Sequence, residues 1–205
     1  MKEIPLDFFS EETRWQSWLD VEAILALSQA KLGMIPKEAA EKIAATANLS
    51  SLNLNELRDE ISSTMAPVFA LSECLARKCG EHGAYVHWGA TTRNIIDTGR
   101  LIILRRFNNK IRFLISEILM TLADQAAEHH DLPMIGRTNL KDALPITLGF
   151  KIASWIDELL RVLERLDDSE KRLFQLRFGG AIGGYNSFDG KGFELSKEMS
   201  RRLNF

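Results

Sequence analysis

The sequence has few of the residues and patterns that mark several common classes of protein. It has only two cysteines, Cys74 and Cys79, and their spacing fits neither a disulfide framework nor a C-x-x-C metal clip. No run of about 18 apolar residues appears, so no membrane span is expected. The net charge of −2 is not the basic surplus of a nucleic-acid binder, and the first residues lack the apolar centre of a signal peptide. We therefore expect a cytoplasmic protein that binds neither nucleic acid nor a membrane.

Strand-like alternation, internal repeats and low-complexity tracts are also absent, whereas helical spacing of apolar residues recurs along the chain. Ser10 and the two glutamates after it suit a helix start, and the pattern continues to Gly33. Further helices are predicted over residues 36–47 and 54–79. Apolar residues make up 45% of the chain, which is enough for a sizeable core.

Two apolar patterns are unusually long for helices of a single domain. They run from about Asp97 to Glu128 and from about Pro145 to Arg177. Two such helices cannot cover each other's apolar surface alone, so we predict an all-α long-helix bundle that assembles into an oligomer. The glycine-rich segment at 177–192 is interpreted as a flexible connection, with an anion-binding nest as the alternative.

The stretch "YVHWGATTRN" gathers polar side chains in one turn before the first long helix. Thr91 or Thr92 suits a helix cap, which leaves His87, Arg93 and Asn94 unexplained. These groups can present donors to a carboxylate at a helix N-terminus, where the helix dipole also favours an anion. A purely structural histidine is the alternative.

The stretch "PMIGRTNLKDALP" places a second polar set between the two long helices. Thr138, Asn139 and Lys141 belong to it. By itself this segment is interpreted as a solvated, capped loop.

Together these stretches resemble two conserved regions of the fumarase–aspartase superfamily. "YVHWGATTRNIIDT" is similar to its H-x-G-x-T-S-x-D-x-x-D-T region, and "GRTNLKDALPITLG" is similar to its G-R-T-H-x-Q-x-A-x-P-x-T-x-G region. "WLDVEAILALSQAKLGMIPKEAA" resembles the N-terminal helix pair of the adenylosuccinate lyase branch. "FGGAIGG" adds a likeness to 3-carboxy-cis,cis-muconate cycloisomerase.

The resemblance implies a homotetramer with a central helical bundle and active sites built from three subunits. It implies an N-terminal helical domain over 1–92 and the first part of the bundle domain over 93–205. It also implies a lyase or cycloisomerase that removes or adds a proton next to a carboxylate of a small polycarboxylate substrate. Carboxymuconate lactonisation or a related elimination is expected, with no metal and no organic cofactor.

Carried onto this sequence, the family's site falls on nine residues. His87 and Asn139 stand at catalytic positions. The substrate-binding positions are Ser63, Thr91, Thr92, Arg93, Asn94, Thr138 and Lys141. Four of these positions depart from the usual pattern. Asn139 and Ser63 stand where histidines are usual, Asn94 stands where an aspartate is usual, and Arg93 stands where a small polar residue is usual.

The family's S-S-x-M-P-x-K-x-N loop, which carries the base serine, has no counterpart in the printed sequence. We therefore expect no lyase activity from the 205-residue chain alone. Three functional hypotheses stand: part of a working lyase or cycloisomerase, an inactive diverged member or truncated fragment that serves binding or assembly, and a generic helical interaction module.

Overall fold

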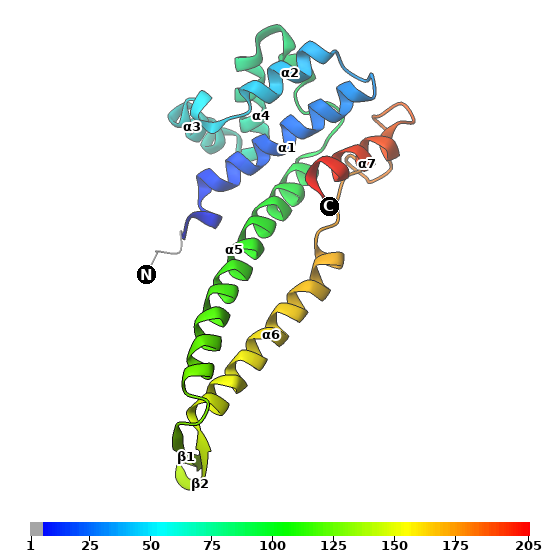
Figure 1. Cartoon of the computed structure of the whole chain (residues 1–205). Coiled ribbons are helices and arrows are strands. Elements are labelled where there is room, and N and C mark those ends of the chain that lie inside the picture. The colour runs from blue at the N-terminus through cyan, green and yellow to red at the C-terminus, as the bar shows by residue number, and fades with distance from the viewer. Residues whose placement is uncertain (1–5) are drawn as a thin grey trace. The chain divides into compact units, whose positions relative to one another are not determined.

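The computed structural model describes residues 6–205, and most of them are helical (Figure 1). The predicted all-α class is confirmed, with one short β-hairpin added. The expectation about a signal peptide concerns in part the first five residues, which lie outside the described part. No helix within residues 6–205 combines the length and the apolar character that crossing a membrane requires.

The chain divides into two compact units. Unit 1 contains residues up to Arg105 together with Phe174–Phe205, and unit 2 contains Arg106–Leu173. The predicted domain boundary after residue 92 stays a prediction.

Unit 1 is a cluster of helices around its own core. Its elements are η1 (Leu6–Phe9), α1 (Glu11–Lys31), α2 (Lys37–Thr46), η2 (Leu49–Ser51), α3 (Leu54–Thr64), α4 (Pro67–Cys79), η3 (Gly80–Tyr85), the start of α5 (Thr92–Glu128) and α7 (Gly192–Leu203). Leu19 and Leu75 are fully buried in this core, and so is Phe188 from the glycine-rich segment. That segment was interpreted as a flexible connection, but its aromatic side chains pack into the core.

α1 begins and ends where its sequence signals predict. The Ser10 hydroxyl accepts a hydrogen bond from the Thr13 N–H at 3.1 Å, and Glu11 and Glu12 follow at the positive end of the helix dipole. The helix ends at Lys31, before Gly33 with φ of +66°. The first predicted helix is therefore confirmed.

The predicted single helix over 54–79 is wrong, because the chain forms α3 and α4 with a break between them. Met65 ends α3 in the left-handed conformation (φ 53°), and Pro67 starts α4. Proline lacks an N–H and disfavours helical geometry in the residue before it, so the helix is interrupted just before Pro67. The apolar spacing continues across the break, which is why the pattern suggested one helix.

The start of α5 lies against α1, and Gly99 permits the close approach. A Cβ at this position would lie 2.7 Å from the Ser17 hydroxyl and 2.8 Å from the Trp18 ring. Trp18 is buried, so a larger residue at 99 has no space without moving the indole.

Unit 2 consists of the rest of α5, strands β1 (Pro133–Thr138) and β2 (Lys141–Thr147), and α6 (Leu148–Leu173). Both predicted long helices are confirmed, but their ends differ from the predicted ranges 97–128 and 145–177. Gly149 lets α6 begin close to the end of α5: a Cβ there would lie 2.6 Å from the His130 Cα. The Gly149 N–H donates to the His129 carbonyl at 2.8 Å.

The hairpin corrects the prediction of a capped loop with no strands. β1 and β2 pair antiparallel, and their two-residue turn has positive φ at both Asn139 (49°) and Leu140 (65°). This is the type I′ geometry that matches the twist of a hairpin. Pro133, Pro145 and Gly136 concealed the alternation, since these residues usually mark loops. Thr138, Asn139 and Lys141 therefore lie at an exposed hairpin tip.

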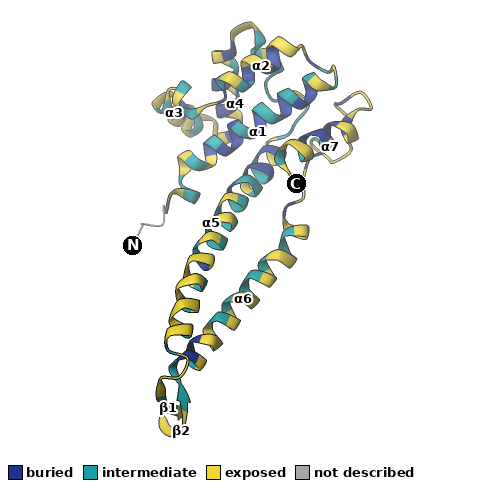
Figure 2. Ribbon diagram, viewed as in Figure 1, coloured by how far each residue is buried: buried dark blue, intermediate teal, exposed yellow. Residues whose placement is uncertain are grey.

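Unit 2 has little core of its own (Figure 2). Its buried apolar side chains are Ile115 and Ile152. Its exposed large apolar side chains are Phe113, Ile118, Met120, Leu132, Ile135, Leu140, Leu144, Phe150, Trp155, Leu160 and Leu173. Exposed apolar surface of this extent is typical of a surface that another chain segment covers.

α7 was not predicted, and a buried carboxylate ties it to α1. Glu198 is 7% exposed and contacts Lys31 of α1 at 2.7 Å. Arg201 and Arg202 donate to the same carboxylate at 2.8 Å each. The hydrogen bonds from Arg201 and Lys31 lower the pKa of Glu198 from 4.5 to about 2.

We predict that Glu198→Gln lowers the free energy of unfolding by about 1–3 kcal/mol at pH 7, because three cations lose a charged acceptor. The folded pKa lies below the unfolded one, so the wild-type advantage is complete above pH 4.5 and is lost as the pH falls towards 2. Urea denaturation between pH 7 and pH 3 measures it. Glu194→Gln, an exposed position on the same helix, is the matched control. An undiminished difference at pH 3 would contradict this account.

Candidate active site

The turn before α5 brings five of the predicted site residues together. It follows η3 and contains two positive backbone angles, at His87 (φ 58°) and Gly89 (φ 70°). A Cβ at Gly89 would lie 2.5 Å from the Phe188 ring, so glycine is required there for space as well as for conformation. Phe188 of the glycine-rich segment thus packs directly against the turn.

His87 is held by a buried carboxylate from α1. Its Nδ1 lies 2.6 Å from Glu22 Oε1, and its backbone N–H donates to Glu22 Oε2 at 3.2 Å. Glu22 is 2% exposed, whereas the His87 side chain retains 22% exposure. Burial lowers the pKa of His87, but the hydrogen bond and the negative charge of Glu22 raise it by more. The net pKa of His87 therefore lies above its usual value.

Asn94 is buried, and its side chain forms hydrogen bonds with backbone groups of the turn and of the glycine-rich segment. Its Oδ1 accepts from the Thr91 N–H at 3.3 Å and from the Gly180 N–H at 3.1 Å. Its Nδ2 donates to the Arg177 carbonyl at 3.4 Å. The first contact is one half of a capping box, and the second fixes the glycine-rich segment. An aspartate, which is usual at this position in the family, has the same acceptor oxygen.

Thr92 and Arg93 lie exposed in the first turn of α5, and Thr91 is half-buried just before it. The Arg93 Nε donates to Asp97 at 2.6 Å, one helical turn later. This pair orients the guanidinium along the helix, while 69% of its side chain stays exposed. The first turn of the helix thus presents a hydroxyl, a guanidinium and free helix N–H groups, all suited to an anion.

The other predicted residues are not part of this turn. Ser63 is exposed near the end of α3, and its hydroxyl donates to the Glu60 carbonyl at 3.0 Å. Thr138, Asn139 and Lys141 belong to the hairpin tip of unit 2 and are exposed. Their assignment to substrate binding or catalysis stays a prediction.

Two site residues were missed, although the sequence contains a signal for them. Glu22 and Gln29 continue the apolar spacing of Trp15, Trp18 and Leu25 on the buried face of α1. A polar side chain at a core position needs a partner, and both find one at the turn. Glu22 binds His87, and the Gln29 Nε2 donates to the Trp88 carbonyl at 2.7 Å.

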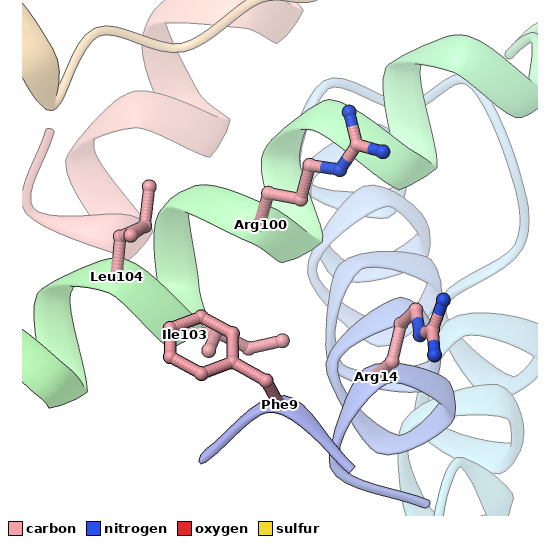
Figure 3. Close-up of a pocket in the computed structure, with 5 residues that line it drawn as sticks. All are labelled: Phe9, Arg14, Arg100, Ile103 and Leu104. Carbon is pink, nitrogen blue, oxygen red and sulfur yellow. The ribbon is translucent and has the colours of Figure 1, made fainter. Parts of the chain in front are cut away.

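A separate pocket of about 360 Å³ lies in unit 1 and combines apolar and cationic walls (Figure 3). Phe9, Ile103 and Leu104 form its apolar part, and Arg14 and Arg100 lie on the other side (Figure 3). None of the predicted site residues lines it. The Nη1 of Arg100 lies 3.6 Å from Oδ1 of Asp97, and the carboxylate of Asp97 also pairs with Arg93.

The described residues contain no group of three or more His, Cys, Asp or Glu side chains placed to hold a metal ion. The expectation that the protein needs no metal or cofactor stays a prediction.

Comparison with known proteins decides the family. A family model described as "Lyase" matches residues 5–204. The chain belongs to this lyase family. N-acetyl-S-(2-succino)cysteine lyase of Enterococcus italicus is 37% identical over 190 residues, which are 93% of this chain and 42% of that protein. Adenylosuccinate lyase of Pyrococcus abyssi is 38% identical over 195 residues, which are 95% of this chain and 43% of that protein.

A solved structure agrees with this result. The 3-carboxy-cis,cis-muconate lactonizing enzyme from Pseudomonas putida gives a TM-score of 0.90 at 32% identity, over 97% of this chain and 46% of that chain. The fumarase–aspartase resemblance and the long-helix fold type are confirmed. The chain spans less than half the length of the relatives it matches.

We predict that Asn94→Ala lowers the free energy of unfolding by about 1–3 kcal/mol, since two backbone N–H groups lose their acceptor. Asn94→Asp should cost less than Asn94→Ala, because one carboxylate oxygen accepts both bonds and only the long Nδ2 bond to the Arg177 carbonyl is lost. Urea denaturation measures both, with Asn109→Ala at an exposed position of α5 as the control. If both variants matched the control, Asn94 would not have the anchoring role described above.

Proposed function

We propose that the protein acts as a lyase or cycloisomerase on a small polycarboxylate, by removing or adding a proton next to a carboxylate. One observation carries the proposal: at the start of α5, exposed donors lie beside a histidine that a buried carboxylate orients. Membership of the lyase family supports the reaction class. Carboxymuconate lactonisation or a related elimination fits it best, in line with the structural relative named above.

The donor set suits a dianionic substrate or intermediate. Removing a proton next to a carboxylate builds negative charge on that group, and positioned N–H, hydroxyl and cationic donors stabilise it. Arg93 and the helix N-terminus supply such donors, and His87 adds another when its ring is protonated. Both lyase relatives named above carry a succinyl group in the names of their substrates, which supports a dicarboxylate unit as the part recognised here.

An inactive binding or assembly subunit is the second candidate. Asn139 favours it, because this residue lies exposed at the hairpin tip and an amide cannot shuttle a proton. A generic helical interaction module is no longer needed as a third hypothesis, since the family is established.

We further propose that the protein assembles through unit 2, as a homotetramer of the kind that the resemblance implies. The exposed apolar side chains of α5, the hairpin and α6 support this. The cytoplasmic location stays a prediction.

The double variant Thr92→Ala/Lys141→Ala should weaken the binding of fumarate by the assembled protein tenfold or more, because each substitution removes a donor to carboxylates. Isothermal titration measures the affinity, with acetate as the monocarboxylate comparison. Thr121→Ala combined with Lys37→Ala removes the same side-chain types at other exposed positions and serves as the control. Unchanged fumarate binding in the site variant would show that the site is assigned to the wrong residues.

Leu160→Glu should raise the dissociation constant of the oligomer by a factor of ten or more. Sedimentation at micromolar concentration should then show smaller species than for the wild type. Leu160 is 46% exposed beside the apolar side of α6, where a new charge would lose its hydration on assembly. Ser154→Glu adds the same charge on the polar side of this helix and should leave assembly intact. A monodisperse wild-type monomer would count against the assembly proposal itself.

A further inference from the structure

Glu22 occupies a position that the helical spacing of α1 assigns to the core. Leu19 and Leu25 on either side of it are 0% and 1% exposed, and Glu22 itself is 2% exposed. A carboxylate without a partner in such a place is costly by several kcal/mol, so its contacts have to compensate. Both of its oxygens bind one residue, His87.

The two contacts define the state of the imidazole ring. A carboxylate oxygen at 2.6 Å accepts a hydrogen bond, so Nδ1 carries the proton in the neutral ring as well as in the charged ring. Nε2 is then the ring atom left for a ligand. The second oxygen accepts from the backbone N–H of the same residue, which holds the backbone at its φ of 58°. Ring and backbone of His87 are thus fixed by one side chain.

Within residues 6–205, the charged partner of this ring is Glu22. Arg93 of α5 pairs with Asp97 instead, and the Nε2 of His82 in η3 lies 3.8 Å from the exposed Glu81 carboxylate. The nearby Gln29 of α1 donates to the Trp88 backbone and carries no charge. The hydrogen bond and the charge of Glu22 are thus what raise the pKa of His87.

We propose that Glu22 is a positioning residue of the active site, which keeps a proton on Nδ1 of His87 and orients the ring so that Nε2 faces the substrate, where the protonated ring donates a hydrogen bond. The substrate part of this inference rests on the proposed function. Its ligand is a carboxylate group of the dianion, which accepts the Nε2–H bond without any covalent step. The raised pKa of His87 agrees with this role, because it keeps the ring protonated to higher pH.

The first test determines the tautomer of His87 in the wild-type protein. The protein labelled with ¹⁵N-histidine has four imidazoles, and His87→Gln identifies the signals of His87 by their loss. Long-range ¹H–¹⁵N spectra distinguish the two tautomers, and we expect the Nδ1–H form for the neutral ring. A neutral ring protonated on Nε2 would overturn the inference.

The second test removes the charge of Glu22 and keeps its shape. Glu22→Gln should lower the titration midpoint of His87 by about one to three pH units, because the neighbouring negative charge is lost. Glu81→Gln, beside His82, should leave the His87 midpoint unchanged. If Glu22→Gln does not fold, Glu22→Asp keeps the charge with a shorter reach, and its His87 midpoint should lie below that of the wild type. A His87 midpoint that does not move in the folded variant contradicts the inference.

A binding measurement separates positioning from general destabilisation. Glu22→Gln should weaken fumarate binding about tenfold at a pH between the His87 midpoints of the two proteins, and the affinity should recover below the new midpoint, where the ring is protonated in both proteins. A loss that persists at all pH values would point to a structural role instead and overturn the positioning role. Absence of fumarate binding in the wild type would contradict the proposed function, while the tautomer and the titration would still decide the role of Glu22.

Discussion

The backbone of His87 has to remain in the left-handed region, and the geometry of the candidate site depends on that constraint. A non-glycine residue held there costs on the order of 1–3 kcal/mol. The hydrogen bond from its N–H to the Glu22 carboxylate is charge-assisted and contributes about as much, so the two effects offset each other. The carboxylate that α1 places beside the turn therefore stabilises this backbone conformation. Gly89 and Asn94 extend the same arrangement to the glycine-rich segment, through Phe188 and the Gly180 N–H.

The two units differ in what stabilises them. Unit 1 buries apolar side chains from α1, α2, α4 and α7 in one core, and its buried carboxylates, Glu22 and Glu198, are both paired. Unit 2 buries few, although α6 carries a long apolar side. α5 and α6 thus carry more apolar surface than they cover by packing against each other. The sustained apolar spacing makes these helices long and regular. It also makes unit 2 dependent on contacts with further chain segments.

Helical spacing and caps were sufficient to predict most of the fold, because these signals are local. The start of α1 at Ser10 and the existence of α5 and α6 followed from them directly. The errors arose where one residue overrides a periodic pattern. Pro67 interrupts a continuous apolar spacing, and the prolines at both ends of the hairpin hide two strands. α7 is short and strongly charged, so its single buried side gave a weak signal.

The candidate site was only partly predictable, for a different reason. A motif identifies residues that are close in sequence, and it found the turn from His87 to Asn94. The partner of His87 lies 65 residues earlier, on a helix that looks like ordinary core packing. A polar residue at a buried position of an apolar spacing indicates that a partner exists, but only the fold shows which residue that is. Glu22 and Gln29 both follow this rule, and both point to the same turn.

The charge environment of His87 also limits what the ring contributes to the proposed reaction. A histidine with a raised pKa is protonated over a wider range of pH, so it is a better donor and a poorer base near neutrality. Arg93 and the N-terminus of α5 are donors too, and the amide of Asn139 does not accept a proton at useful pH. The residues assigned to the site are thus mostly donors, which suit negative charge. In the proposed reaction the proton is removed by a group other than these, and the turn before α5 serves to hold the carboxylate on which charge develops.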